Sequence, residues 1–507
     1  MSGLVVAYGR PRLEELQKMF EKISHRGPYA SGIWNKNRVM MAQNYLRADI
    51  GANMVQSNQV PVGNGSDGEL RICYDGQIGN RQQLAYTSGL RGGPFEEERL
   101  LLHLYQDHGR GMLQYLTDAI FALVISDGED FFAARDLLGI KTLYYGWKDK
   151  TLYLASELKS IFEVTEEVYE FPPGHSMGPK GRLIRFAELP STPPNEFHSD
   201  LDRMIKDIRA IIQRSLRNRV DFRVPTGSLL SGGIDSSVIT YLASEAYREK
   251  FGKDMRLETF ALGVGESSDI PNARVIATFI NTDHHELIVD PEGILKVLPE
   301  VIYYLESFDP SLVRSAVSNF LISRYAREHG IQILLSGEGG DEIFCGYIYL
   351  KDFLADELFA RQMECIGLLH NNGALRLDRM NQCHSIRVVT PLISGELLNY
   401  AMAIPPEYKQ KPEGDEKIEK WILRKAFETI LPEGVVWRLK QEFSQGSGSA
   451  SVLPHYFEDF ISDEDLARAQ AKYPMVRTKE ELYYFRIFTE HFGSQHAVKT
   501  VGQWICL

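Results

Sequence analysis

Two glycine-containing turns in the sequence carry acidic and hydroxyl side chains that could hold a nucleotide phosphate and a divalent cation. The first turn, residues 231–237, has two adjacent glycines followed by Asp235. Adjacent glycines let backbone N–H groups approach an oxyanion, and a helix that follows them points its positive end at the same place. Asp235 could hold Mg²⁺ against a bound phosphate. The alternative is an ordinary strand–helix turn whose Asp and Ser side chains only cap the helix.

The second turn, residues 336–347, contains three acids among its glycines. Asp341 and Asp235, if they lie close together in the fold, would form a two-carboxylate Mg²⁺ site across a nucleoside triphosphate. Glu338 is then a candidate general base. No lysine follows the glycines as it does in a Walker A loop, which favours attack at the α-phosphate with pyrophosphate leaving over transfer of the γ-phosphate.

Strands that alternate with helices are expected to position these turns. Apolar runs at 224–230, 257–264 and 331–335 are separated by stretches with helical periodicity. This alternation predicts a parallel sheet with ligands at the carboxyl ends of its strands. Before residue 190 the pattern differs, because short β-rich runs surround only two expected helices, at 12–23 and 96–108. That part is predicted to be an α+β domain with layered antiparallel sheets.

Composition limits the remaining possibilities. A proline-rich connector predicts a first domain at 1–190, a linker at 191–199 and a second domain at 200–507, with mostly helical structure after about residue 348. The formal net charge of −12 argues against a nucleic-acid partner. Five scattered cysteines without CxxC spacing suggest neither a disulfide framework nor a zinc site. Since no apolar run could span a bilayer and no signal peptide is evident, we expect a cytoplasmic protein without a membrane partner.

Ordered motifs along nearly the whole chain resemble those of the asparagine synthetase family. The turn at 231–236 resembles the pyrophosphate loop of ATP-pyrophosphatases, and 336–342 resembles the second synthetase motif. The other similar stretches are 25–28, 134–141, 172–175, 283–286, 307–309 with Arg314, 419–424 and 437–444. The resemblance implies an α/β protein in which an Ntn-hydrolase-like α+β sandwich precedes an α/β ATP-pyrophosphatase domain with a helical C-terminal part.

The resemblance also implies roles for individual residues in adenylating a carboxylate with Mg²⁺-ATP, so that an amine can form an amide while AMP and pyrophosphate are released. Glu338 would help to deprotonate the amine, and Lys440 would stabilise the charge that develops on the acyl-adenylate. Arg314 and Gly339 would lie near the substrate, and Asp235 and Asp341 would hold Mg²⁺. The expected nucleotide contacts are Leu229, Val264, Ser336 and Gly337, and the expected pyrophosphate cradle is Ser231, Gly232, Gly233, Ser236 and Ser237, with Asp235 beside it as the Mg²⁺ ligand.

The first domain departs from the family where glutamine would be hydrolysed. Family members use an N-terminal cysteine, whereas Ser2 stands here, and a serine hydroxyl is a weaker nucleophile. Arg47 matches the arginine for the glutamine carboxylate. Other pocket positions differ from the family, namely Asp75 for Asn, Gln77 for Glu, Glu97 for Asp and Tyr29 for Asp. We therefore predict that this degenerate pocket does not hydrolyse glutamine and that ammonia or another amine arrives from outside.

The acceptor side of the second domain is altered as well. A Glu and an Arg of the family are replaced within 387–394, so aspartate is only the default among the small-molecule carboxylate substrates. Two other functions remain open. One is ring closure as in β-lactam synthetases, although Glu338 stands where that group has a Tyr. The other is a silent scaffold, which the retained Asp235, Asp341 and Lys440 oppose. A homodimer is possible.

Overall fold

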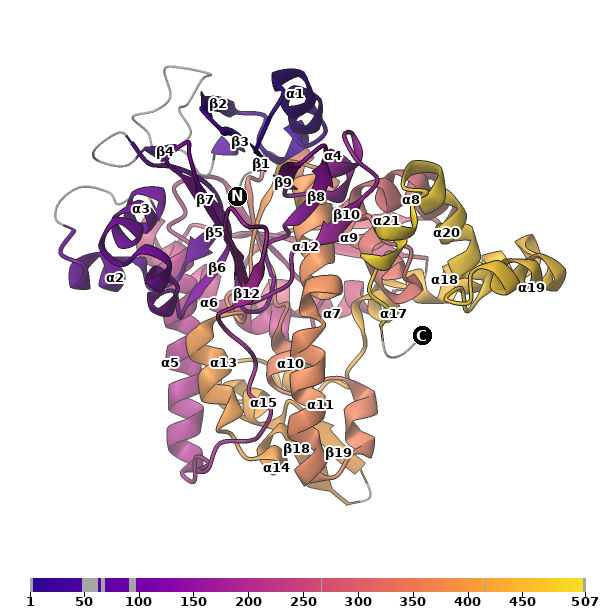
Figure 1. Ribbon diagram of the computed structural model, residues 1–507. Coiled ribbons are helices and arrows are strands. Elements are labelled where there is room, and N and C mark those ends of the chain that lie inside the picture. The colour runs from indigo at the N-terminus through magenta and orange to yellow at the C-terminus, as the bar shows by residue number, and fades with distance from the viewer. Residues whose placement is uncertain are drawn as a thin grey trace. The chain divides into compact units, whose positions relative to one another are not determined.

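The computed structural model describes residues 3–47, 63–64, 69–90, 97–265, 267–414 and 416–504, and the chain forms two compact units (Figure 1). The first unit comprises the chain up to Leu189 together with 369–387 and 489–502. The second comprises 190–368, 388–488 and the remaining C-terminal residues. The sequence predicted a first domain of residues 1–190, and the two later segments that join this unit were not part of that prediction.

Two six-stranded antiparallel sheets form the first unit. One sheet has the order β10-β8-β9-β1-β3-β2, and its strands are β10 (Val168–Glu170), β8 (Tyr144–Lys148), β9 (Thr151–Ala155), β1 (Leu4–Tyr8), β3 (Val39–Tyr45) and β2 (Ala30–Lys36). The other has the order β12-β11-β7-β6-β5-β4, and its strands are β12 (Leu183–Arg185), β11 (His175–Met177), β7 (Phe131–Arg135), β6 (Ala119–Ser126), β5 (Arg71–Ile78) and β4 (Gly63–Asn64).

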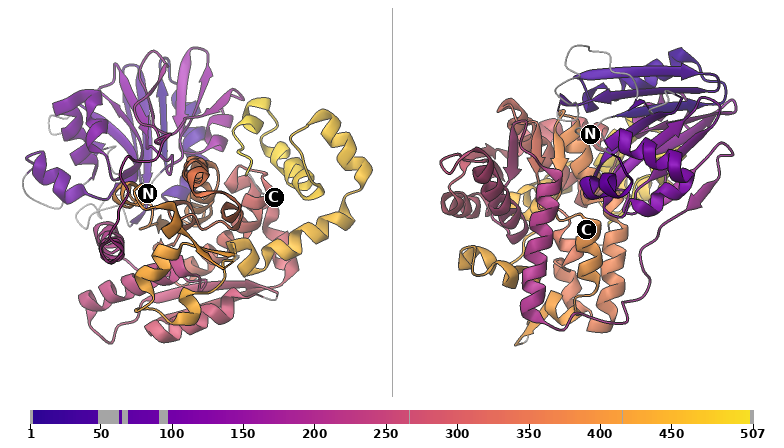
Figure 2. Two further views of the ribbon diagram at one scale, coloured as in Figure 1. Left: turned by 90° about the horizontal axis from the view of Figure 1, so that it is seen from below. Right: turned by 90° about the vertical axis from the view of Figure 1, so that its left-hand side faces the viewer.

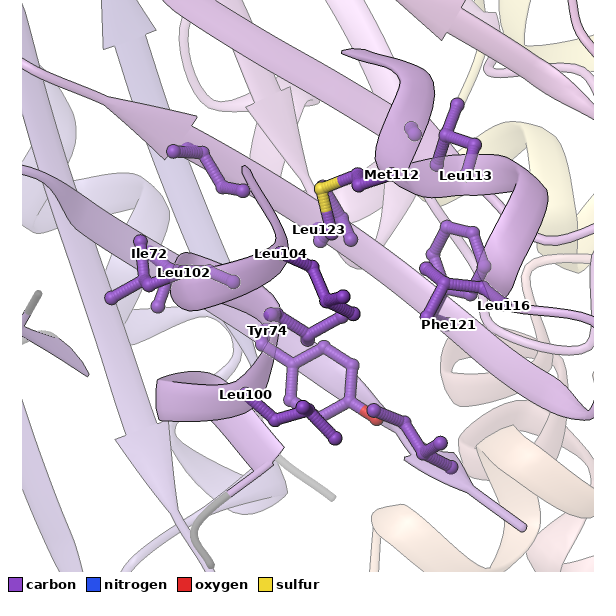
Figure 3. Packing of buried hydrophobic residues seen from close by; sticks show 14 of the residues in the cluster. Ile72, Tyr74, Leu100, Leu102, Leu104, Met112, Leu113, Leu116, Phe121 and Leu123 are labelled. Atoms are coloured by element: carbon purple, nitrogen blue, oxygen red, sulfur yellow. The ribbon is translucent and has the colours of Figure 1, made fainter. Parts of the chain in front are cut away.

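Alternating side chains of the strands build a core on each face of the second sheet. On β6, Ala122 and Val124 pack with Leu4 and Val6 of the first sheet. Phe121 and Leu123 point the other way, into a cluster with apolar side chains of helix α3 (Glu97–His108) and of the following segment 109–116, as Figure 3 shows. Because successive residues of a strand face opposite sides, a strand such as β6, which is apolar except for Ser126, must be covered on both faces. The predicted sandwich of layered antiparallel sheets is confirmed.

Helices complete the first unit. Those on the sheets are α1 (Leu13–Glu21), α2 (Arg81–Thr87), α3 and α4 (Leu158–Phe162), and the later segments add α12 (Gly373–Gln382) and α21 (Gln495–Lys499). The helix predicted at 12–23 is shorter at both ends, because the chain turns into a short 3₁₀ helix at Ser24–Arg26. Of the helix predicted at 96–108, residues 97–108 are described and helical.

A five-stranded sheet with the order β15-β14-β13-β16-β17 organises the second unit, and β13 pairs in parallel with both β14 and β16. The strands are β13 (Thr226–Leu229), β14 (Glu258–Val264), β15 (Asp283–Val289), β16 (Ile333–Leu335) and β17 (Arg387–Val389). The three strands predicted from apolar runs are therefore present, each with shorter bounds than predicted, and the predicted parallel pairing is confirmed.

Most of the remaining chain is helical. The helices of the strand-alternating region are α5 (Leu201–Arg219), which is seen lengthwise in the right-hand view of Figure 2, α6 (Ile234–Phe251), α7 (Asp269–Ile280), α8 (Pro291–Leu305) and α9 (Pro310–Glu328). The later helices are α10 (Gly340–Ile343), α11 (Ala355–Gly367), α13 (Gly395–Met402), α14 (Pro406–Lys409), α15 (Trp421–Phe427), α16 (Glu433–Val436), α17 (Phe443–Ser447), α18 (Ser449–Phe460), α19 (Asp463–Lys472) and α20 (Lys479–His491).

A small hairpin of β18 (Gln410–Glu413) and β19 (Glu416–Glu419), which the sequence did not predict, interrupts these helices. In the part of the chain that the structure describes, no helix combines the length and the apolar character needed to cross a membrane.

Candidate functional site

The first glycine turn connects β13 to α6 and requires glycine at Gly232. The backbone there has a φ of +73°, and an added Cβ would lie 2.5 Å from the backbone carbonyl carbon of Asn272. A side chain at this position would therefore collide with α7 and also adopt a left-handed conformation that only glycine takes without strain. The turn is packed closely against the helix that follows the neighbouring strand.

Serine hydroxyls hold the turn in shape. The hydroxyl oxygens of Ser231 and Ser236 lie 3.1 Å apart, and the amide of Gly233 donates to Ser231 Oγ at 3.4 Å. Gly233, which has no side chain, is the N-cap of α6. A capping role for the serines is therefore limited to the bond from the Gly233 amide to Ser231 Oγ, and Asp235 contacts Lys420 instead. Ser237 Oγ is buried and has no hydrogen-bond partner among the described residues.

The second glycine loop, between β16 and α10, lies directly against the first. A Cβ on Gly337 would lie 2.7 Å from the backbone carbonyl carbon of Asp235, and one on Gly340 would lie 2.3 Å from Asp235 Oδ1. Gly339 has a φ of +94° and packs on Ile393. A larger residue there would have a strained backbone and would collide with Ile393. The predicted meeting of the two turns at one edge of the sheet is observed.

Two carboxylates and two ammonium groups meet at this edge. Lys420 Nζ contacts Asp235 Oδ2, and it lies 2.7 Å from Asp341 Oδ1. Lys440 Nζ donates to Asp341 Oδ2 at 2.7 Å. Burial alone would raise the pKa of Asp341, but the ammonium groups of Lys420 and Lys440 hold it below its usual range. Burial likewise opposes the charge of Lys440, whereas Asp341 and Asp235 raise its pKa above the ordinary value.

Lys420 was not assigned by the sequence analysis, although 419–424 was among the stretches that resemble the family. It is fully buried and follows β19, as the N-cap of α15 with a positive φ of 52°. Nothing local marks it as functional, since an ammonium in a helical region is most often a solvated side chain. The available signal was the need for a counter-charge to two carboxylates predicted to lie close together.

The donor set at this edge fits Mg²⁺ together with phosphate oxygens. Asp235 Oδ1 is buried without a hydrogen-bond donor among the described residues, and Asp341 approaches from the facing loop. Mg²⁺ is usually bound through one or two carboxylates and substrate phosphates, with water completing the shell. The described residues hold no cluster of three or more potential metal ligands, so the phosphates would have to supply further ligands.

Arg438 is a second residue that sequence reasoning missed. Its guanidinium donates to the carbonyl oxygen of Ser231 at 3.2 Å and pairs with Asp269 Oδ1 at 3.0 Å. Burial raises the pKa of Asp269 to about 6, although Arg438 and Lys440 lower it. Arg438 therefore links the loop that carries Lys440 to the first glycine turn and to the start of α7.

The other predicted residues of this site lie on the same edge or beside it. Leu229 and Val264 end the neighbouring strands β13 and β14. Ser336 follows β16, and its amide donates to the carbonyl of Val389 at 3.0 Å. Glu338 is half-buried in the second loop. The neighbouring Glu342 is fully buried, and burial followed by the charges of Glu338 and Asp341 raises its pKa to about 8.

Arg314 has a partner that the sequence did not indicate. Its Nε lies 3.0 Å from Glu480 Oε1, and Tyr484 donates to the same oxygen at 2.8 Å. Glu480 is almost completely buried on α20. The guanidinium predicted to face the substrate is thus held by a carboxylate from the C-terminal helices.

In the first unit, the predicted glutamine-pocket residues are engaged with neighbouring groups. Asp75 lies on β5 and is completely buried, with Oδ2 at 2.8 Å from Arg26 Nη2 and Oδ1 at 3.6 Å from Lys141 Nζ. Glu97 accepts hydrogen bonds from the hydroxyl of Tyr74 at 2.8 Å and from the amide of Ile78 at 3.1 Å. Both carboxylates are held by groups of the same unit.

The other residues predicted for this pocket differ in burial. Arg47 is exposed, with its guanidinium carbon 5.9 Å from the ring centre of Tyr29. Gln77 is buried on β5. Ser2 lies outside the described residues, and its neighbour Gly3 donates its amide to Asn44 Oδ1 at 2.6 Å.

Comparisons with known proteins found matches to both the first and the second part of the chain. The family model described as asparagine synthase matches residues 207–373 and 360–503, and the glutamine amidotransferase domain matches 1–175. The chain is 32% identical to asparagine synthetase [glutamine-hydrolyzing] 1 of Saccharomyces cerevisiae, covering 98% of this chain and 93% of the relative. It is 33% identical to asparagine synthetase [glutamine-hydrolyzing] 2 of Arabidopsis thaliana, covering 97% and 86%.

These matches define an enzyme with a glutamine amidotransferase domain and an asparagine synthase domain. The chain belongs to the asparagine synthase family, a family of carbon–nitrogen ligases. Among solved structures, a glutamine PRPP amidotransferase from B. subtilis matches with a TM-score of 0.32 and 15% identity, covering 56% of this chain and 81% of the other. An NH3-dependent NAD synthetase from Campylobacter jejuni matches with a TM-score of 0.24 and 13% identity, covering 54% and 93%.

Proposed function

We propose that this protein is an ATP-dependent amide-forming synthetase that adenylates a carboxylate, with aspartate as the default, and releases AMP and pyrophosphate. We propose further that it takes ammonia or another amine from solution rather than from glutamine hydrolysed in its own first unit. The observation that carries the synthetase assignment is the convergence of Asp235, Asp341, Lys420 and Lys440 at the carboxyl edge of a parallel sheet.

Each group at this edge has a role in the proposed reaction. The backbone amides of the first glycine turn and its serine hydroxyls would bind the pyrophosphate portion of ATP. Asp235 and Asp341 would hold Mg²⁺, which would offset the negative charge of the phosphates. Lys440 would stabilise negative charge on the acyl-adenylate, since a fixed cation in a buried site needs no reorganisation. Glu338 would accept a proton from the attacking amine.

Displacement of Lys420 accompanies metal binding in this proposal. In the structure its ammonium contacts both carboxylates, so it occupies the region in which a divalent cation would contact them. A phosphate oxygen beside the metal could then become the new partner of the ammonium, because Lys is a compact cation with three rotatable donors.

The loss of glutamine hydrolysis is supported by Ser2 and by the pairing of Asp75. An amide at residue 75 could both donate to and accept from a bound glutamine, but a carboxylate can only accept. Asp75 is instead paired with Arg26 and Lys141. Removing it from these partners would leave buried charges uncompensated, at a cost of about 3–5 kcal/mol. A glutamine molecule would have to compete with these ion pairs.

A pyrophosphate-release assay tests the synthetase assignment. The protein is incubated with Mg²⁺-ATP and a panel of carboxylates, with ammonium, with glutamine or without an amine. We expect release that depends on one carboxylate, an amide product with ammonium, and no glutamate from glutamine. Release with no member of the panel would contradict the assignment and favour the scaffold function. Release that depends on a substrate carrying its own amine, with a cyclic product, would favour ring closure.

A further inference from the structure

Three buried polar side chains lie next to the backbone segment that follows Asp341. Gln362 is on α11, Lys409 ends α14, and Gln410 begins β18. All three are at least 96% buried, although glutamine and lysine side chains are usually exposed. None of them was assigned a role by the sequence motifs, and their positions can be followed from the labels α10, α11, α14 and β18 in Figure 1.

The two glutamine amides bind carbonyl groups at the C-terminal end of α10. Gln362 Nε2 donates to the carbonyl oxygens of Glu342 and Ile343, at 3.1 Å and 2.6 Å. Gln410 Nε2 donates to the carbonyl oxygen of Cys345 at 2.7 Å. The last carbonyls of a helix have no partner within the helix, and α10 has a single turn, so external donors must satisfy them. The two buried amides supply these donors.

Lys409 determines which way the Gln362 amide points. Its Nζ donates to Gln362 Oε1 at 2.8 Å. An ammonium has donors and no acceptor, so the amide oxygen must face Lys409 and the amide nitrogen must face the two carbonyls. The reversed amide would place donor against donor on one side and oxygen against two carbonyl oxygens on the other.

Lys409 is unusual in having no carboxylate partner among the described residues. Burial lowers the pKa of Lys409 to about 8, and the nearby Cys345 opposes this change only in part. Burying an ammonium that no carboxylate neutralises costs free energy, and groups kept under such conditions are enriched at functional sites. The bond to Gln362 Oε1 is the one polar contact of this side chain within the described part of the chain.

The hairpin that follows Lys409 connects these residues to the two carboxylates a second time. Gln410 on β18 is opposite Glu419 on β19, and Lys420 is the next residue of the chain. Lys420 in turn contacts Asp235 and Asp341. The base of one hairpin therefore holds the end of α10 through Gln410 and contacts the carboxylate of Asp341 through Lys420.

We propose that Gln362, Lys409 and Gln410 are positioning residues that fix α10 and thereby place Asp341 for Mg²⁺-ATP, with Lys409 acting by orienting the amide of Gln362. The proposal rests on the proposed function for its kinetic consequence, whereas the hydrogen bonds that it invokes do not depend on activity.

Substitutions at Gln362 and Lys409 separate positioning from simple core packing. Gln362→Glu keeps the size and gains an ion pair with Lys409, but it replaces the donor to Glu342 and Ile343 with an oxygen. Lys409→Met removes the group that orients the amide, and Lys409→Arg keeps a cationic donor. Arg361→Gln on the same helix, which removes an exposed ion pair with Glu364 and a cation–π contact with Phe353 but touches neither Lys409 nor the α10 carbonyls, is the matched control.

The readout is the apparent Mg²⁺ constant and the KM for Mg²⁺-ATP in pyrophosphate release. For Gln362→Glu and Lys409→Met we expect both to rise by about tenfold or more with a smaller change in kcat, because a displaced ligand weakens binding of the metal complex. Lys409→Arg should restore most of the loss, and Arg361→Gln should match the wild type. Wild-type Mg²⁺ dependence in both Gln362→Glu and Lys409→Met would overturn the proposal.

Hydrogen–deuterium exchange provides a second test that needs no activity. Peptides covering 339–350 should exchange faster in Gln362→Glu and Lys409→Met than in the wild type, while peptides from β13 and β14 should not change. Unchanged exchange at 339–350 would overturn the proposal even if the enzyme is active. Faster exchange together with a wild-type protein that releases no pyrophosphate would instead reject the proposed function and leave the positioning role supported. Should Gln362→Glu not fold, Lys409→Met and its rescue by Lys409→Arg decide both tests.

Discussion

The two units each bury a group of carboxylates with cations, but the two groups differ in what their oxygens contact. In the first unit, Asp378 of α12 pairs with Arg26 at 2.7 Å and with Lys141 at 3.2 Å, and Asp75 pairs with the same two cations. In the second unit, Asp235 Oδ1 has no donor among the described residues. The carboxylates of the first group are paired with cations, whereas the second group keeps an open acceptor beside the first glycine turn.

This difference separates a structural charge cluster from a ligand site. A buried ion pair contributes little net stability compared with apolar packing, yet breaking it is costly, so a compensated cluster holds its elements in place. A buried acceptor without a donor is unfavourable unless a ligand or cation completes it. We therefore propose that the group at Asp235 serves catalysis and that the group at Asp75 holds β5, Arg26 and α12 together.

Paired substitutions should separate the two groups most strongly. Asp235→Asn keeps the shape of the side chain but removes a proposed Mg²⁺ ligand, and we expect pyrophosphate release to fall by about a thousandfold or more. Asp75→Asn breaks a buried ion pair, and we expect a lower melting temperature with ammonium-dependent activity within about twofold of the wild type. Steady-state kinetics and calorimetry check both. If Asp235→Asn retained wild-type activity, the distinction between a ligand site at Asp235 and a structural cluster at Asp75 would be contradicted.

Lys440 and Lys420 should differ in the parameter that each controls. Lys440→Met is expected to lower kcat by about a hundredfold, as for loss of one fixed group that stabilises transition-state charge. Lys420→Met should mainly raise the KM for Mg²⁺-ATP, because its proposed partner after metal binding is a phosphate oxygen. Lys420→Arg serves as the charge-retaining control. Equal losses of kcat in both methionine variants would contradict this division of roles.

The pH dependence of activity should reflect the ionisation of Asp269. Its pKa is raised to about 6, so it loses its charge as the pH falls through that value and its pair with Arg438 weakens. We expect activity to fall below pH about 6, and Asp269→Asn to remove this inflection while lowering activity at neutral pH. The contribution of Asp269 to the free energy of unfolding should change in the opposite direction and rise as the pH falls. A carboxyl whose pKa is raised by folding contributes stability that is fully present below its unfolded pKa of about 4 and is lost as the pH rises through about 6. An inflection that persists in Asp269→Asn would exclude this residue.

The smallest expected effect is that of Ser2→Cys. Replacing Ser2 alone by cysteine should leave glutamate release from glutamine at background, since Asp75 remains paired with Arg26 and Lys141. The amount of glutamate formed over several hours, compared with an enzyme-free control, checks this. Robust release would show that the pocket is intact and that Ser2 alone disables it.

The nucleotide edge could be predicted from local patterns, because each part of it is a short apolar strand followed by glycines and an acid. That logic correctly brought Asp235 and Asp341 together and placed Leu229 and Val264 at the ends of adjacent strands. It did not identify Lys420, Arg438 or Glu480. Lys420 and Arg438 lie in stretches that resemble the family, but each of the three residues acquires its partner only through the tertiary fold.

In the first unit, too, sequence patterns predicted the strands but not the long-range contacts. The sandwich was predictable from strand composition, but the return of α12 to this unit was not, because Asp378 gains its partners only through long-range contacts. The departures at Asp75 and Glu97 were visible in the sequence. Their hydrogen-bond partners, which explain how an acid is accommodated at these positions, required the structure.

The source of the amide nitrogen is the most direct test of the account. The enzyme is given Mg²⁺-ATP, the active carboxylate, unlabelled ammonium and glutamine labelled with heavy nitrogen at its amide, and the mass of the amide product is measured. We predict an unlabelled product, with AMP and pyrophosphate formed in equal amounts and no labelled nitrogen lost from glutamine. A labelled product, formed with stoichiometric glutamate, would contradict the claim that the first unit no longer supplies the amine.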